Sequence, residues 1–165
     1  MPALDVEFWV PGPVEKVWEF YRYPKNLEKV SPAHLGVRIV GEPETRNGEL
    51  VEIALKPAWL PFALHWISRI EEVQGEGPRR QFVDVMERGL FRSWKHVHRL
   101  ESGDHEFQSS SGQQIKSHEA GTWVVDHVDY ELPFGPLNSL ANQLLVKRAL
   151  GSMFSERKKF LQRLF

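Results

Sequence analysis

Two histidines and an aspartate are the residues of this chain whose types and spacing could do chemistry. Trp94, His96 and His98 alternate along one predicted strand, so their side chains share a face of it. Asp126 belongs to a later strand that alternates in the same way. Two imidazoles and a carboxylate on one sheet face could bind a divalent metal ion, form a hydrogen-bonded His–Asp pair, or present polar groups to a ligand.

We favour the structural His–Asp pair over the ligand-facing group, and both over the metal site. The sequence therefore predicts no metal and no cofactor. The pairing assumes a hairpin centred on Ser111, which places His96 opposite Asp126 and His98 opposite Val124. A bulge of one residue would move the partners to opposite faces of the sheet and destroy the pair.

Arg157 is the unusual residue of the predicted C-terminal helix, because it lies within the apolar stripe that contains Met153 and Phe154. A buried guanidinium needs an acceptor, since an unpaired buried charge costs several kcal/mol. We expect an ion pair with Asp84 or Asp126 on the sheet. The alternative is that Arg157 anchors an anionic head group of a bound molecule.

Acid–base catalysis would require titratable side chains that converge in a cavity. The candidates for such a role are His96, Asp126 and Tyr130, and Tyr21 and Glu52 are weaker ones. The sequence contains no phosphate-binding glycine loop, no G-x-S-x-G elbow and no H-E-x-x-H motif. Whether the protein is an enzyme is thus left open, with a non-enzymatic role favoured.

The elements that must position these residues are mostly strands. Alternating or β-branched segments, separated by Pro, Gly and Asn-Gly signals, predict seven of them, at residues 4–10, 36–40, 50–56, 62–73, 80–86, 91–100 and 122–132. Helices are predicted at residues 13–23 and 26–30, after the first strand. A long helix follows the last strand and runs to the C-terminus.

Two segments have unusual patterns. Residues 103–119 resemble an insertion, and we expect the flanking strands to continue through it as a hairpin that could cover a pocket or contact a partner. In the last helix, the apolar positions of residues 137–145 and 146–165 point in nearly opposite directions. Either the helix bends near Gln143, or its first turns pack against loops or against a second subunit in a homodimer.

Length and composition limit which classes of protein this chain can belong to. The 165 residues are enough for one domain spanning 1–165, and a net charge of −1 gives no reason to expect nucleic-acid binding. There is no cysteine, no leader-like segment and no apolar run long enough to span a membrane, which predicts a cytoplasmic protein. Six Trp and ten Phe predict either a thick core or an apolar pocket.

The order of these elements, together with several short motifs, resembles the helix-grip fold of the START-like or SRPBCC superfamily, which includes polyketide cyclase/dehydrase relatives. The resemblance is greatest to bacterial ligand-binding members related to cell-division inhibitors. The motifs that carry it are Val14-Glu-Lys-Val-Trp-Glu-Phe20, Trp66-Ile-Ser-Arg-Ile70, Phe82-Val-Asp84, Gly89-Leu-Phe91, Trp94-Lys-His-Val-His98, Gly121-Thr122, Asp126, Tyr130, Pro133 and Phe154-Ser-Glu-Arg157.

The resemblance implies an α+β fold in which a curved, seven-stranded antiparallel sheet wraps around the long C-terminal helix. It also implies an apolar cavity between sheet and helix, with residues 57–61 as a portal. By this analogy the ligand-binding residues are Trp66, Phe82, Trp94, His96, Val128, Tyr130, Met153, Phe154 and Arg157. The leading hypothesis is binding, transport or sensing of a small hydrophobic molecule. The alternatives are a cyclase/dehydratase-type enzyme and a protein-interaction module using the 103–119 hairpin.

Overall fold

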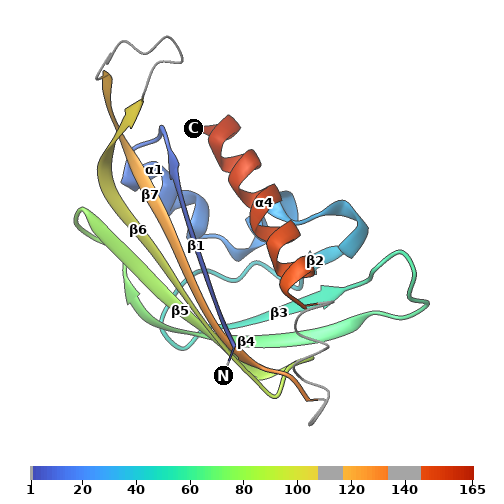
Figure 1. Ribbon diagram of the computed structural model, residues 1–165. Helices are drawn as coiled ribbons and strands as arrows, with labels where there is room; N and C mark the ends of the chain where they lie inside the picture. Colours follow the sequence, from blue (N-terminus) through green and yellow to red (C-terminus); the bar gives the residue numbers. More distant parts are fainter. Residues whose placement is uncertain (1, 108–116, 134–145) are drawn as a thin grey trace.

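The computed structural model describes residues 2–107, 117–133 and 146–165. A curved sheet runs through it, and α4 and the short helices lie on its concave side (Figure 1). The strands are β1 (Ala3–Val10), β2 (Val37–Ile39), β3 (Leu50–Leu55), β4 (Leu64–Gln74), β5 (Arg79–Arg88), β6 (Ser93–Phe107) and β7 (Ser117–Glu131). The helices are α1 (Val14–Tyr21), α2 (Leu27–Val30) and α4 (Lys147–Leu164), with single 3-10 turns at Pro24–Asn26 and Ala33–Leu35.

The sheet has the order β1-β7-β6-β5-β4-β3-β2, and every neighbouring pair is antiparallel. From β2 to β7, strands that are consecutive in sequence are neighbours in the sheet, whereas β1 and β2 lie at its opposite edges. The first strand pairs with the last, so the sheet brings the N-terminal strand beside the one that precedes α4. This architecture confirms the predicted α+β helix-grip fold.

The last two strands are longer than the sequence pattern suggested. β6 and β7 stay paired from Ser93 and Glu131 out to Phe107 and Ser117, and they pass Gly103 and Gly121 without a bulge. Backbone hydrogen bonds maintain this ribbon, so it does not need the apolar alternation that marks a half-buried strand. The flanking strands therefore extend as expected, whereas the predicted turn at Ser111 lies outside the described residues.

The register of this hairpin differs from the prediction. His98, not His96, lies opposite Asp126, and His96 lies opposite Val128. The displacement is two residues along one strand. Because side chains alternate with a period of two, an even displacement keeps every side chain on its expected face. His96 and Asp126 consequently still share a face, as diagonal neighbours.

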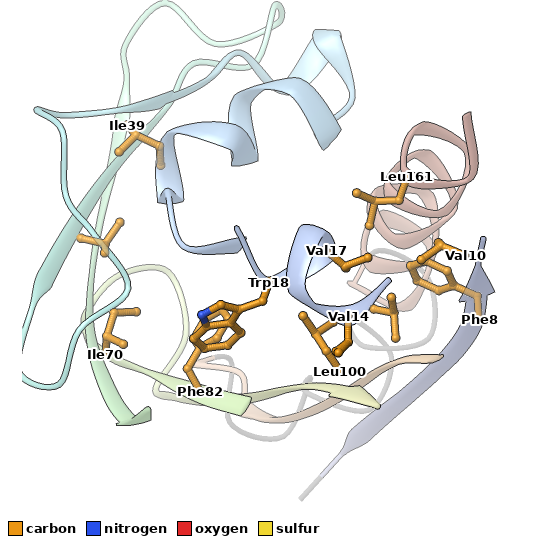
Figure 2. Close-up of a cluster of buried hydrophobic side chains, with 12 residues drawn as sticks. Phe8, Val10, Val14, Val17, Trp18, Ile39, Ile70, Phe82, Leu100 and Leu161 are labelled. Carbon is orange, nitrogen blue, oxygen red and sulfur yellow. The ribbon is translucent and has the colours of Figure 1, made fainter. Parts of the chain in front are cut away.

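Buried side chains form two clusters. The larger cluster joins β1, α1 and the C-terminal part of α4 to the middle of the sheet, with Val17, Trp18, Phe82 and Leu161 among its members (Figure 2). The smaller one lies where β7 meets the first turns of α4 and includes Val128, Tyr130, Leu132, Leu150 and Phe154. Between them, these clusters fix how far α4 stands from the sheet.

The buried face of α4 is narrower than the predicted stripe. Leu150, Phe154, Arg157 and Leu161 are buried at spacings of four and three residues, and Leu164 is 50% exposed. Such spacing lines up one face of a helix. The two alternatives for residues 137–145, a bend near Gln143 or first turns packed against loops or a second subunit, concern residues outside the described part of the chain.

Candidate functional site

A cavity of about 450 Å³ lies between the concave face of the sheet and α4. Its wall is mainly apolar and includes Val51, Ile53, Trp66, Ile70, Phe82 and Phe154. The strands contribute alternate side chains because every second residue points to the concave face. The sheet and the helix therefore enclose a space suited to an apolar molecule.

Seven of the nine predicted ligand-binding residues line this cavity: Trp66, Phe82, Trp94, His96, Met153, Phe154 and Arg157. Val128 and Tyr130 do not line it, and this corrects their expected position. Both are 0% exposed and belong to the core cluster beneath the start of α4. They face the correct side of β7, but α4 packs directly over that part of the strand and leaves no space there.

The predicted portal segment also reaches the cavity. Pro57 and Trp59 line it, and Trp59 is 75% exposed. Leu90, on the turn between β5 and β6, lines the cavity as well and is 43% exposed. Side chains that are both exposed and part of the wall mark the rim of the cavity.

The polar part of the wall is built on two neighbouring histidines held between two aspartates. The ring centroids of His96 and His98 lie 3.6 Å apart, and the ring planes are tilted by 35°. Nε2 of His96 lies 2.9 Å from Oδ1 of Asp126, and Nδ1 of His96 lies 3.4 Å from Oδ2 of Asp84. Nε2 of His98 lies 2.9 Å from the same Asp84 oxygen. Nδ1 of His98 is 3.0 Å from Asp126 Oδ1, but its orientation does not make a hydrogen bond.

Arg157 completes this His–Asp cluster from the helix side. Its Nη1 lies 3.3 Å from Asp126 Oδ1, which is the expected ion pair with one of the two candidate carboxylates. Burial opposes ionisation of Asp126, yet Arg157 and the two histidines outweigh it and hold the pKa of that carboxyl well below its usual range. Asp126, which is 1% exposed, is therefore a buried carboxylate with charged neighbours on both sides.

The surroundings shift the pKa values of the two neighbouring histidines in opposite directions. Burial and the neighbouring His98 charge lower the pKa of His96 to about 4. Burial also disfavours the charged form of His98, but its contacts with Asp126 and Asp84 outweigh this and raise its pKa. Of the two histidines, His98 is therefore the one whose charged form the two aspartates favour.

Asp84 is the residue whose importance the sequence analysis underestimated. Its second oxygen accepts hydrogen bonds from Trp94 Nε1 at 3.1 Å and from Ser68 Oγ at 3.3 Å. Ser68 in turn accepts one from Trp66 Nε1 at 2.8 Å. One carboxylate thereby fixes both tryptophans of the cavity wall. Its alternation with Phe82 along β5 was the available signal that its side chain faces the cavity.

The other acid–base candidates lie in different surroundings. Tyr21 lines the cavity, and burial raises the pKa of its hydroxyl above the usual range. Glu52 instead contacts His65 at 3.0 Å on an exposed part of the sheet. Among the described residues, Asp126 and Tyr130 do not line the cavity, so His96 and the weaker candidate Tyr21 are the predicted acid–base residues on its wall.

Sequence comparison identifies the family. Residues 10–154 match the family model described as polyketide cyclase / dehydrase and lipid transport. The chain belongs to this family. The match spans every strand from the end of β1 and most of the cavity wall, and the predicted superfamily is confirmed. No curated protein sequence matches the chain.

Solved structures of this superfamily are similar over nearly the whole chain. The protein TTHA0849 from Thermus thermophilus is 19% identical, with 99% of each chain covered and a TM-score of 0.57. Protein Ms6760 from Mycobacterium smegmatis is 17% identical, with 99% of this chain and 92% of that one covered and a TM-score of 0.60. Norcoclaurine synthase from Thalictrum flavum is 13% identical, with 98% and 87% covered and a TM-score of 0.58. At these identities the likeness shows the fold alone.

Among the residues that the structure describes, no helix is both long enough and apolar enough to cross a membrane.

Proposed function

We propose that this protein binds a small hydrophobic molecule in the cavity between the sheet and α4. The observation that carries the proposal is the apolar wall of a cavity of about 450 Å³. Cavities of about 300–1,000 Å³ with a few convergent polar groups are typical of small-molecule sites. The family description, which includes lipid transport and cyclases, supports the same class of ligand.

The polar residues would orient the ligand. His96, His98, Asp84 and Arg157 face the cavity from β5, β6 and α4, while the rest of the wall is largely apolar. A molecule with an apolar body and one polar group matches this division, because the polar group would find hydrogen-bonding partners that are already fixed in place. Trp59 on the rim would then contact the ligand as it enters.

Native mass spectrometry of protein purified without organic solvent tests the proposal, and a fluorescent apolar probe such as 1-anilinonaphthalene-8-sulfonate gives a second measurement. We expect a co-purified molecule or saturable probe binding. Met153→Trp adds bulk to the cavity wall and should weaken probe binding at least tenfold, whereas Ser155→Trp, on the exposed side of the same helix, should not. Ligand-free protein that binds no probe, or equal binding by both variants, would contradict the proposal.

An enzyme of the cyclase or dehydratase type is the second candidate. The favouring observation is that His96, whose pKa is lowered, and His98, whose pKa is raised, both line the cavity, so two imidazoles with pKa values shifted apart face the same space. Norcoclaurine synthase, which has the same fold, was solved in complex with dopamine and hydroxybenzaldehyde. If this protein is catalytic, the co-purified molecule should differ in mass between the wild type and His98→Gln. Identical molecules in both would argue for binding alone.

The interaction module remains a prediction. Its hairpin tip, residues 108–116, lies outside the described residues, and the homodimer and the cytoplasmic location are likewise untested.

A further inference from the structure

We propose that Asp84, His96 and His98 bind one divalent transition-metal ion, of the zinc type, at the polar end of the cavity. One donor atom from each of the three residues lies within 4.8 Å of the others. Two imidazoles with one carboxylate form a donor set that suits zinc and its neighbours in the first transition series. The proposal does not depend on a hydrophobic ligand, because protein side chains supply all three donors.

The spacing of the donors agrees with coordination of a single ion. Metal bonds of about 2.1 Å at angles of about 90° to 109° place neighbouring donors about 3.0 to 3.4 Å apart. Oδ2 of Asp84 lies 2.9 Å from Nε2 of His98 and 3.4 Å from Nδ1 of His96. Both carboxylate–imidazole separations therefore stand close to those that a shared ion would impose.

The far side of the His96 ring is held in the way that metal-binding histidines require. Nε2 of His96 makes a 2.9 Å hydrogen-bond contact with Oδ1 of Asp126, and Nδ1 of His98 lies 3.0 Å from the same oxygen without a hydrogen bond. Such a carboxylate selects the tautomer whose other nitrogen has a free lone pair. Nη1 of Arg157 lies 3.3 Å from the same oxygen of Asp126.

The proposed ligands are accessible from the cavity. Asp84, His96 and His98 all line it, so the remaining coordination positions of a bound ion would face the cavity interior. Those positions would take water, or an oxygen donor such as a carboxylate or phenolate on a bound molecule. The ion would thus supply the fixed point at which a mainly apolar ligand is held.

Titration of the untagged, chelator-stripped protein with Zn²⁺ or Co²⁺ tests the proposal. We expect one ion per chain by calorimetry, and visible Co²⁺ bands from nitrogen and oxygen ligands, since the chain has no cysteine. Asp84→Asn and His98→Gln should weaken binding at least 100-fold. His127→Gln is the matched control, because His127 also lies between two aspartates, Asp5 and Asp129, but on the surface. It should bind the ion as the wild type does.

Wild-type protein that takes up no stoichiometric ion would overturn the proposal, and so would unchanged binding by folded Asp84→Asn and His98→Gln. If these variants do not fold, imidazole NMR spectra of the wild type decide the question. Co²⁺ should broaden the ring resonances of His96 and His98 at one equivalent and leave that of His127 sharp. Broadening of His127 alone would refute the site. Apolar-probe binding is measured separately, so failure of either proposal can be told from failure of the other.

Discussion

Replacing Arg157 by methionine tests whether the buried charges of this protein depend on one another. Arg157 is 7% exposed, and its partner Asp126 is 1% exposed. Methionine has a similar length and is apolar, so the change removes the guanidinium without leaving a large hole. It leaves Asp126 as a buried carboxylate that has lost its permanently charged neighbour.

Breaking a buried ion pair by removing one partner costs about 3–5 kcal/mol. His96 and His98 still contact Asp126 after the change, which favours the lower end of that range. The guanidinium also lies 5.0 Å from the ring centroid of Phe154, and this cation–π contact is lost too. We expect Arg157→Met to lower the free energy of unfolding by about 3 kcal/mol. For a chain of this length, that corresponds to a Tm lower by about 6–12 °C.

Urea unfolding followed by tryptophan fluorescence measures this change. Arg163→Met, on the exposed side of the same helix, is the control and should stay within about 0.5 kcal/mol of the wild type. The double variant Arg157→Met/Asp126→Asn should lose at least about 1 kcal/mol less free energy of unfolding than the two single variants lose in sum. The reason is that it no longer buries an unpaired carboxylate. A loss below about 0.5 kcal/mol for Arg157→Met, or strict additivity in the double variant, would refute the reasoning.

Three further changes probe packing, backbone and surface charge. Leu161→Ala, at a position 0% exposed, should lower the free energy of unfolding by about 2–5 kcal/mol, whereas Leu164→Ala, at 50% exposed, should change it little; urea melts compare them. Gly36→Ala should lower Tm by several degrees, because φ is +56° and the new Cβ would lie 2.3 Å from a backbone oxygen; calorimetry measures this. The hydrogen bond to Asp5 raises the pKa of His127. The contribution of this pair to the free energy of unfolding is therefore complete below pH about 6.5 and vanishes as the pH rises through the raised pKa. The free energy of unfolding of the wild type should therefore exceed that of His127→Gln by less than about 1 kcal/mol at pH about 5.5, and the two should be equal at pH about 9.

Local patterns were enough to predict the elements of the fold. Apolar alternation located the strands, and Pro and Gly residues marked the turns between them, because both signals act within a few residues of chain. The strand ends were less well predicted where polar residues continue a ladder, as they do beyond Leu100 in β6. Backbone pairing there is decided by the neighbouring strand rather than by the side chains.

The sequence also predicted which face His96, His98 and Asp126 share, since that follows from alternation alone. It did not predict which of the histidines lies opposite Asp126, because register depends on where a hairpin turns. It likewise named Asp84 as a possible partner of Arg157 and as part of the Phe82-Val-Asp84 motif, but not as a partner of the histidines. The contacts of Asp84 with both histidines arise from the pairing of β5 with β6, in which Asp84 lies directly opposite His96.

What the sequence alone determined is the family, the sheet around a helix, and the inward-facing side chains. What only the tertiary structure decided is which of those side chains meet a cavity and which are sealed in the core. Val128 and Phe82 both face inward on their strands, yet α4 packs on the first and the cavity lies beside the second. The distance between sheet and helix sets this difference, and it results from packing summed over the whole domain rather than from any local pattern.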